Sequence, residues 1–247
     1  MPNEPVVGMS RADVKYNAVN SDPFFLKGEH PMQRQNFCVT LAVAAIGLFS
    51  TGAFAQEEGF TTLFDGKTLT GWTGSVDGYV VEEGAIVCKP KGGGLLYTEK
   101  EYGDFTFRFE FKLTPGANNG IGIRTPKGGD PAYVGMEIQV LDDTADQYKS
   151  LQQYQYHGSI YGVAAAKKGH LKPVGEWNTE EITCKGKQVT IVLNGETIVD
   201  TDIEKASTPK TIDGKDHPGL KREKGFICFC GHGAKVDFRN LRVKELK

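Results

Sequence analysis

The chain has 247 residues, of which 39% are hydrophobic and 24% are charged, and its formal net charge is −2 at pH 7. This composition is typical of a soluble protein with one or two domains. Because basic residues are not in excess, the charge balance gives no support for a protein that binds nucleic acid.

The N-terminal part of the chain predicts export. Residues 1–31 show no hydrophobic period and are interpreted as a non-native extension. Arg34 then precedes the apolar run Cys38–Phe49, and Ala53-Phe54-Ala55 offers a cleavage site, so 32–55 is expected to be a signal peptide. A buried core helix fits these flanks less well. The run is too short for a membrane anchor. We therefore expect an exported protein, periplasmic or extracellular, that is not an integral membrane protein after processing.

Export would leave four cysteines in a compartment that permits disulfides, namely Cys88, Cys184, Cys228 and Cys230. Cys228 and Cys230 lie two residues apart on one face of an expected strand, which suits neither a mutual bridge nor, alone, a zinc site. Free buried thiols and a bridge with another partner both remain open.

Residues 56–247 are predicted to form one all-β domain. In the clearest strand, 104–113, four phenylalanines and Leu113 alternate with polar residues, which indicates a half-buried antiparallel strand. Asn194-Gly195 between two alternating runs is a strong hairpin signal. Further strands are expected at 80–88, 94–98, around Ile121 and Ile123, and at 133–143, 182–184, 188–193, 197–199, 226–230 and 236–243. Many short strands separated by turns predict a β-sandwich or jelly roll of two antiparallel sheets.

The strand expected at 133–143 contains an acidic residue among β-forming residues. Alternation places Val134, Met136, Ile138 and Val140 on the core face, and Gly135, Glu137, Gln139 and Leu141 on the other. A bare buried carboxylate costs several kcal/mol, so Glu137 is expected to face either solvent or a cleft.

Three segments between the strands are less regular. Residues 145–156 fit either a short helix or a loop, and 158–177 is too long for a hairpin connection. Long loops over a rigid sheet often carry function. The charged segment 204–224 is interpreted as a solvated loop that can border the cleft.

A series of motifs runs in order through 60–247. They are LFDGKTLTGW at 63–72, GDF at 103–105, NNGI at 118–121 with Arg124, EIQVLD at 137–142, GSIY at 158–161, KPVGEWN at 172–178, NG at 194–195, and HG at 232–233 with FRN at 238–240. As an ordered set they resemble the 3-keto-glycoside hydrolase family, also described as 3-keto-glucoside 1,2-lyase and 3-keto-2-hydroxyglucal hydratase domains. Asn119 stands where serine is usual, and Phe229-Cys230 replaces a common Leu-Gln pair.

The resemblance implies a concanavalin-A-like jelly roll and a substrate that is a glycoside oxidised at C3. A ketone at C3 acidifies the hydrogen on C2, so a base can remove it and the C1 substituent can leave by β-elimination. Addition of water completes a net hydrolysis. Such a site needs a base, an electrophile for the enolate oxygen and an acid for the leaving group.

Three residues fit these catalytic roles. Glu137 is the candidate base, and Arg124 is its candidate electrostatic partner on a strand expected to lie alongside. His232 lies in a Gly-His-Gly turn that exposes the imidazole, which suits acid–base catalysis. A purely structural ion pair between Glu137 and Arg124, and a structural histidine at 232, are the alternatives.

The candidate substrate-binding residues are Asn118, Gln139, Asp142, His157, Tyr161, Lys172 and Trp177. Trp177 and Tyr161 could stack on a sugar, although packing explains Trp177 equally well. No cofactor is firmly implied. Glu137, His157 and His232 could together hold a divalent ion, but the sequence contains no compact metal-binding motif such as His-Glu-x-x-His that supports this. The acidic run that begins at Asp142 fits either a calcium loop or a solvated turn.

Two other functions compete with this one. A non-catalytic, lectin-like carbohydrate-binding module would share the fold and the export. A conventional retaining glucanase needs two carboxylates about 5 Å apart, hence four residues apart on one strand face. Position 141 is leucine, which argues against the glucanase.

Overall fold

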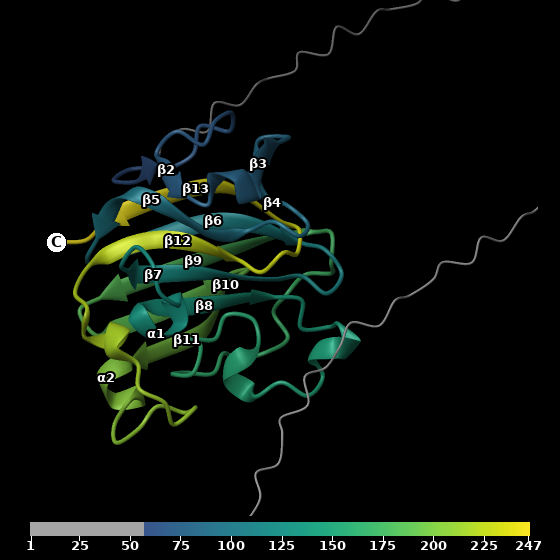
Figure 1. The fold of residues 1–247 in the computed structure, drawn as a ribbon. Coiled ribbons are helices and arrows are strands. Elements are labelled where there is room, and N and C mark those ends of the chain that lie inside the picture. Colours follow the sequence, from purple (N-terminus) through teal and green to yellow (C-terminus); the bar gives the residue numbers. More distant parts are fainter. Residues whose placement is uncertain (1–56) are drawn as a thin grey trace, which may run out of the picture. The chain divides into compact units, whose positions relative to one another are not determined.

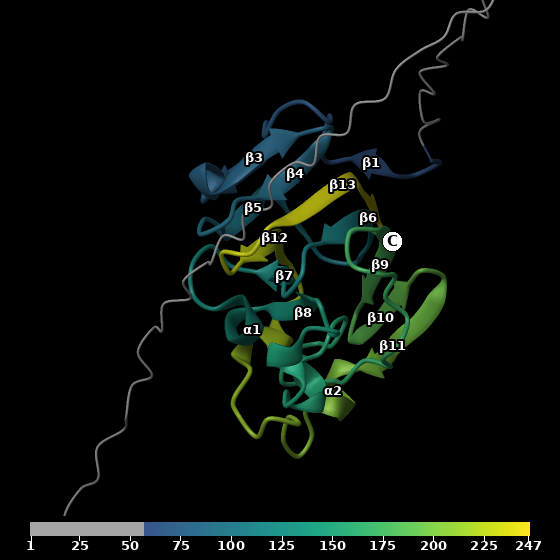
Figure 2. The ribbon, with the colours of Figure 1, turned by 90° about the vertical axis from the view of Figure 1, so that its right-hand side faces the viewer.

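The computed structural model describes residues 57–247, which form two antiparallel β-sheets stacked on each other (Figure 1). The predicted jelly-roll β-sandwich is confirmed. Figure 2 shows the two layers edge-on, with β5, β12, β7 and β8 in one and β13, β6, β9 and β10 in the other. The predicted extension at 1–31 and signal peptide at 32–55 lie outside the described residues.

The larger sheet has eight strands in the order β11-β10-β9-β6-β13-β4-β3, and β1 also pairs with β13. Its strands are β1 (Thr61–Thr62), β3 (Tyr79–Glu82), β4 (Ala85–Cys88), β6 (Phe105–Leu113), β9 (Trp177–Lys185), β10 (Gln188–Leu193), β11 (Glu196–Asp202) and β13 (Val236–Glu245).

The smaller sheet has five strands in the order β2-β5-β12-β7-β8. Its strands are β2 (Trp72–Gly74), β5 (Gly94–Tyr102), β7 (Asn118–Thr125), β8 (Met136–Leu141) and β12 (Gly225–Gly231). The predicted neighbours β7 and β8 do pair, with Gly122 opposite Glu137 and Gly120 opposite Gln139.

The core lies between the sheets and is rich in aromatic rings. The alternating residues of β6 are buried as predicted, from Phe105 to Leu113. Phe229 of the smaller sheet stacks on Phe238 of the larger one, with ring centroids 4.1 Å apart. Each fully buried phenylalanine stabilises the fold by about 1.5–3 kcal/mol, so these rings hold the two layers together.

The strand predicted from residue 133 begins later than expected. Tyr133 and Val134 belong instead to the helical turn α1 (Pro131–Val134), and β8 starts at Met136. The side chain of Asp130 accepts a hydrogen bond from the N–H of Ala132 at 3.1 Å, and Pro131 occupies the first turn. Asp before Pro is a helix-start signal, and here it outweighs the β-forming residues that follow.

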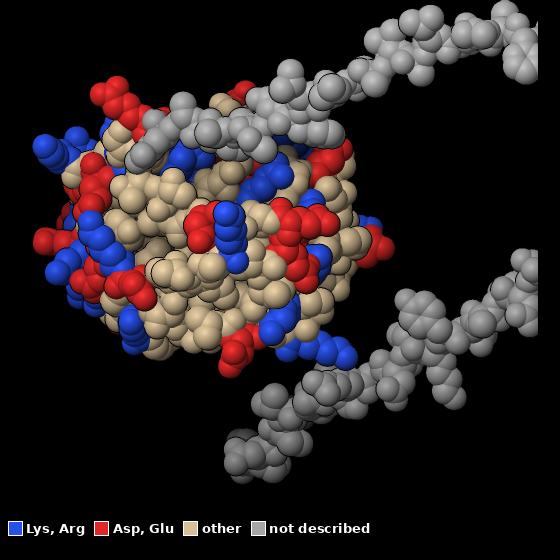
Figure 3. Space-filling model, turned by 90° about the horizontal axis from the view of Figure 1, so that it is seen from above, with Lys and Arg blue, Asp and Glu red and all other residues tan. Residues whose placement is uncertain are grey.

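The remaining elements are short. They are the α-helix α2 (Ile203–Ala206) and the 3₁₀ helices Val76–Gly78, Asp146–Tyr148, Gln153–Gln155 and Pro218–Lys221. The segment 145–156 is therefore a loop with two 3₁₀ turns. Within 57–247 no helix is long and apolar enough to cross a membrane. All four described cysteines are buried and free. Charged side chains of both signs are interspersed on the face shown in Figure 3.

A peptide segment covers the free edge of β8. The N–H of Gln139 donates to Ser159 O at 3.0 Å, and the N–H of Tyr161 donates to Glu137 O at 2.9 Å. Every residue of β8 is buried as a result, although β8 is the last strand of its sheet. An edge strand needs such a cover to avoid pairing with another chain. This cover also makes Glu137 part of an enclosed site.

Candidate active site

A cavity of about 250 Å³ lies over β7 and β8, on the face of the smaller sheet that points away from the core. It is lined by Asn118, Asp130, Ala132, Tyr133, Glu137, Gln139, Leu141, Tyr148, Leu151, Gln155, Tyr161 and His232. These residues come from the two strands, from α1, from the loop after β8 and from the turn after β12. Glu137, Gln139 and Leu141 all face it, as the alternation predicted.

Glu137 is held inside this cavity by the geometry of the neighbouring strand. Its side chain is only 6% exposed. A Cβ atom at Gly120 would lie 2.0 Å from Oε1 of Glu137, so the carboxylate rests directly against the backbone of β7. Glycine in a strand often marks such a close approach. Gly120 therefore sets the direction of the Glu137 carboxylate.

His232 is the nearest titratable partner of this carboxylate. Its Nε2 atom lies 3.5 Å from Oε1 of Glu137, and its side chain remains 50% exposed. Gly233, with φ of 82°, provides the turn that presents the ring. The contact with Glu137 raises the pKa of His232 above its ordinary value of 6.5, against the opposing effect of burial. The contact with Glu137 thus favours the protonated form of the imidazole.

Two buried acceptors in the cavity have no partner. Neither Oε1 of Gln139 nor Oδ1 of Asn118 accepts a hydrogen bond from the described chain. Buried polar atoms are almost always paired, so these oxygens are poised to accept hydrogen bonds from a bound molecule. Tyr161 lies beside them, and its hydroxyl accepts a hydrogen bond from Gln155 Nε2 at 3.1 Å.

Most of the chain matches the model of one known protein family. Residues 59–244 match the model of the 3-keto-alpha-glucoside-1,2-lyase-like domain. The chain belongs to this family.

Similarity to individual proteins supports this assignment. A protein of Bacteroides thetaiotaomicron named 3-keto-disaccharide hydrolase is 29% identical over 232 residues, which cover 77% of this chain and 80% of the relative. A crystal structure of a candidate glycosyl hydrolase from Parabacteroides distasonis matches with a TM-score of 0.66 and 29% identity, covering 77% of this chain and 95% of that one. A second such structure from the same organism gives 0.67 and 28%, with coverages of 76% and 99%.

Arg124 does not line the cavity, contrary to the prediction that it faces Glu137. Its φ of 50° is left-handed, which breaks the alternation of β7 at this residue. The buried guanidinium instead donates to Asp104 Oδ1 and to Gly186 O, both at 2.8 Å, and to Gly103 O at 3.0 Å. Arg124 therefore ties the β5–β6 turn and the β9–β10 turn to β7 and has a structural role.

His157 is also placed away from the cavity. Its Nδ1 atom accepts the N–H of Leu141 at 3.2 Å, and its Nε2 atom lies 3.1 Å from Oε2 of Glu180. This pair is fully buried between the sheets, and its orientation is not that of a linear hydrogen bond. A substrate cannot reach His157, so we assign it a structural role.

The acidic run after β8 is used by the chain itself. Asp142 accepts hydrogen bonds from the N–H groups of Gly116 and Thr144, at 2.8 and 3.0 Å. Burial alone would raise the pKa of Asp142, but the hydrogen bonds outweigh burial and lower the pKa below its ordinary value. Asp143 Oδ1 accepts the N–H of His157 at 2.9 Å. Asp142 was predicted to contact the substrate, but it stabilises this turn instead. Because the chain itself occupies the carboxylates of Asp142 and Asp143, they are not free to form the calcium loop considered above.

Lys172 and Trp177 lie together outside the cavity. Nζ of Lys172 donates to Trp177 O at 2.9 Å. The indole ring of Trp177 packs against Arg239, whose guanidinium carbon is 3.9 Å from the ring centroid, and against Lys112 at 4.8 Å. Trp177 therefore packs against neighbouring side chains, which was the alternative to stacking on a sugar. Neither Lys172 nor Trp177 lines the site.

Several residues that line the cavity were not predicted from the sequence to belong to the site. Asp130 and Tyr133 reach the site because α1 replaces the start of the predicted strand, and the Asp-Pro pair was the available signal. The charge of Asp130 contributes to the raised pKa of His232 after the larger effect of Glu137. Lys215, from the loop read as a solvated excursion, donates to the Tyr133 hydroxyl at 2.9 Å.

The structure does not gather the side chains proposed for a divalent ion. Glu137 and His232 lie together, but His157 is buried elsewhere. Across residues 57–247, no group of three or more His, Cys, Asp or Glu side chains has an arrangement that could hold a metal ion.

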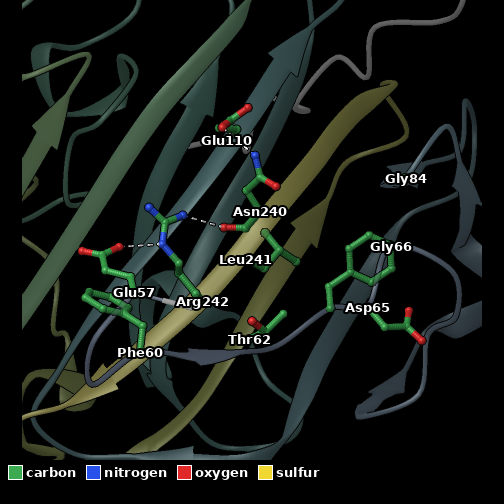
Figure 4. A pocket seen from close by; sticks show the side chains of 11 residues that line it. Glu57, Phe60, Thr62, Asp65, Gly66, Gly84, Glu110, Asn240, Leu241 and Arg242 are labelled. Carbon is green, nitrogen blue, oxygen red and sulfur yellow. Dashed lines mark hydrogen bonds and ion pairs between the residues drawn. The ribbon is translucent and has the colours of Figure 1, made fainter. Parts of the chain in front are cut away.

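A larger cavity of about 460 Å³ lies beside β1 and β13 (Figure 4). Glu57 and Glu110, two of its three carboxylates, are paired with arginines. Glu57 accepts from Arg242 at 3.0 Å, and Glu110 accepts from Arg239 and Asn240 at 2.7 and 2.6 Å. The guanidinium groups stabilise the ionised form of these carboxylates and cannot exchange a proton near neutral pH, whereas the imidazole that faces Glu137 can. The smaller cavity is therefore the better candidate for catalysis.

Proposed function

We propose that the chain hydrolyses glycosides of sugars oxidised at C3, by removal of the C2 proton, β-elimination and rehydration. The observation that carries this proposal is the Glu137–His232 pair, which lies within one cavity beside unpartnered buried acceptors. Membership of the family, and the named relative from Bacteroides thetaiotaomicron, support the choice of substrate class.

The first half of the reaction breaks the glycosidic bond. Glu137 takes the C2 proton, which the adjacent C3 ketone makes acidic, and the electrons form an enolate. The enolate expels the C1 substituent, and His232 gives its proton to the leaving oxygen. The product on the enzyme is a 2-hydroxyglucal that carries a ketone at C3.

The second half adds water. Neutral His232 takes a proton from water as its oxygen attacks C1, and Glu137 returns a proton to C2. Both residues end in their starting protonation states, and the net change is one water consumed and one glycosidic bond hydrolysed. The raised pKa of His232 favours the protonated ring that the first step requires.

The unpartnered acceptors supply orientation. The oxygens of Gln139 and Asn118 can each accept a hydrogen bond from a sugar hydroxyl, which holds the pyranose ring over Glu137. A site built to receive hydroxyl groups strongly rejects analogues that lack them, because its buried groups are then left unpaired.

The test compares Glu137→Gln with Glu196→Gln, a carboxylate at an exposed position on β11. With a 3-keto-disaccharide as substrate, we expect Glu137→Gln to lose turnover by at least about a thousandfold, because the amide cannot accept the C2 proton. Glu196→Gln should retain the wild-type rate. Both variants should keep the wild-type melting temperature to within a few degrees.

Activity of Glu137→Gln within about tenfold of wild type, or roughly 1.4 kcal/mol of barrier, would show that Glu137 is not the base. A wild-type protein that binds the sugar without turnover would contradict the proposal and leave a carbohydrate-binding module.

A further inference from the structure

The proposed reaction develops negative charge on the C3 oxygen, and the site must stabilise that charge. Arg124, the residue predicted for this task, is held by Asp104 and by backbone carbonyls outside the cavity. A preorganised donor at a developing oxyanion is worth about 10²–10³ in kcat. Another donor in the cavity is therefore needed.

Three tyrosines line the cavity, and their hydroxyls differ in their partners. Tyr148 lies 3.2 Å from a backbone carbonyl, to which it donates its proton. Tyr161 accepts from a neutral amide, that of Gln155. Tyr133 accepts from the ammonium group of Lys215 at 2.9 Å. A cationic donor withdraws more charge from the phenol oxygen than a neutral amide does, which makes Tyr133 the strongest hydrogen-bond donor of the three.

We infer that the Tyr133 hydroxyl donates its proton in a hydrogen bond to the C3 oxygen of the substrate as the enolate forms, and that Lys215 positions this hydroxyl. The inference rests on the proposed function. Because Lys215 occupies a lone pair of the phenol oxygen, the O–H proton is left free to point at another acceptor. The proton stays on Tyr133 throughout, so the step adds no proton transfer to the reaction.

The surrounding chain fixes Tyr133 from two sides. Nδ1 of His217 donates to the carbonyl of Ala132 at 2.9 Å, and the His217 ring packs on the Tyr133 ring with centroids 4.8 Å apart. Nε2 of His217 lies 3.1 Å from both carboxylate oxygens of Asp213. The loop that carries Lys215 is thus pinned to α1.

The backbone of Lys215 is held as well. Its N–H donates to Asp213 Oδ1 at 3.0 Å, and its carbonyl accepts the hydroxyl of Thr211 at 2.7 Å. The hydrogen bond to Tyr133 raises the pKa of Lys215, which is the direction expected when the partner prefers the charged ammonium. Lys215 is therefore a cation at neutral pH.

The experiment separates enolisation from bond cleavage. Rehydration run in reverse begins with removal of the C2 proton of 3-keto-glucose, so the enzyme should exchange this hydrogen in deuterated water. Proton NMR of 3-keto-glucose measures that exchange, and turnover of a 3-keto-disaccharide measures cleavage. The variants are Tyr133→Phe, Lys215→Met and Lys215→Arg, with Tyr102→Phe and Lys205→Met as matched controls outside the cavity. Thermal unfolding checks that each variant is folded.

We expect Tyr133→Phe to lower the C2 exchange rate and kcat together by about a hundredfold, with KM changed by less than about threefold. Lys215→Met should lower both rates by about tenfold, and Lys215→Arg should restore them to within about threefold of wild type. Both controls should match the wild type.

Exchange by folded Tyr133→Phe within threefold of the wild-type rate would overturn this inference and leave the proposed function standing. Equal exchange rates in Lys215→Met and wild type would remove Lys215 from its positioning role. A wild-type protein that neither exchanges nor cleaves would overturn the proposed function, and this inference with it.

Discussion

Glu137 and His232 form a pair in which the carboxylate favours the protonated form of the imidazole. The contact joins Nε2 of His232 to Oε1 of Glu137 over 3.5 Å, and it raises the pKa of the imidazole. An ionised carboxylate is the form that accepts the C2 proton, and an imidazolium is the form that protonates the leaving oxygen. The contact therefore favours the form of His232 that the first step requires.

NMR titration of His232 tests this coupling without any substrate. In the wild type the pKa should lie above 6.5, and in Glu137→Gln it should fall toward that value because the carboxylate is gone. The folded state binds this proton more tightly than the unfolded chain. The pair therefore stabilises the fold fully below pH about 6.5, and this stability is lost as the pH rises through the folded-state pKa. An unchanged pKa in Glu137→Gln would show that the two groups do not interact.

Arg124 is expected to affect stability and not chemistry. Arg124→Ala removes a buried cation from Asp104 and leaves carbonyl groups without donors, so the free energy of unfolding should fall by about 3–5 kcal/mol. Urea denaturation measures this change, with the partly exposed Arg108→Ala as a control that should cost about 1 kcal/mol. The kcat of the folded fraction should stay within about threefold of wild type. A large loss of kcat at unchanged stability would restore Arg124 to the active site.

At the scale of elements, the strands β7 and β8 work as one unit. Gly120 of β7 provides the space that the Glu137 carboxylate of β8 occupies. In Gly120→Ala the new Cβ would overlap that carboxylate, so Glu137 must turn away from His232. Because a displacement of about 1 Å can cost a hundredfold in rate, we expect a loss of this size in kcat/KM.

The control for this substitution is Gly103→Ala, where the closest heavy atom to the new Cβ would lie at 3.3 Å. Its activity should equal that of the wild type. Loss of activity in Gly120→Ala should be accompanied by a fall in the pKa of His232, since the carboxylate contact is broken. Full activity in Gly120→Ala would show that the position of the carboxylate seen here is not the working one.

The parts of the elements that the sequence predicted well are those governed by local periodicity. The alternation in β6 and in residues 136–141 is regular, because one face of each strand lies in the core and the other does not. Tyr133 and Val134 were misplaced because a helix-capping pair precedes them. Arg124 was misplaced because its left-handed φ redirects the side chain, and no property of a single arginine announces such a conformation.

At the scale of the whole molecule, the site depends on contacts between distant parts of the chain. Glu137 and His232 are 95 residues apart, and Tyr133 and Lys215 are 82 apart. Periodicity carries no information about such contacts. Glu137 and His232 were each proposed as catalytic, but the predicted partner of Glu137 was Arg124. Lys172 and Trp177 belong to motifs of the same family but lie outside the cavity, as the long connection from β8 to β9 carries them away.

A comparison of the 460 Å³ cavity with the 250 Å³ cavity illustrates why volume alone does not identify a site. The larger cavity contains carboxylates that arginines neutralise, whereas the smaller one contains an acid–base pair and unpartnered acceptors. Net charge near zero gives the molecule no strong field to attract a charged partner. A neutral sugar recognised by hydrogen bonds agrees with both observations.

The proposed mechanism removes the C2 hydrogen before the glycosidic bond breaks. It is tested most directly by turning over a 3-keto-disaccharide in deuterated water and measuring deuterium at C2 of the 3-keto-glucose formed, at early conversion and against a control without enzyme. Because His232 is half exposed to water, the proton on Glu137 can exchange with solvent before it returns, and we predict deuterium at C2. Product that retains its original C2 hydrogen at full activity would contradict the account.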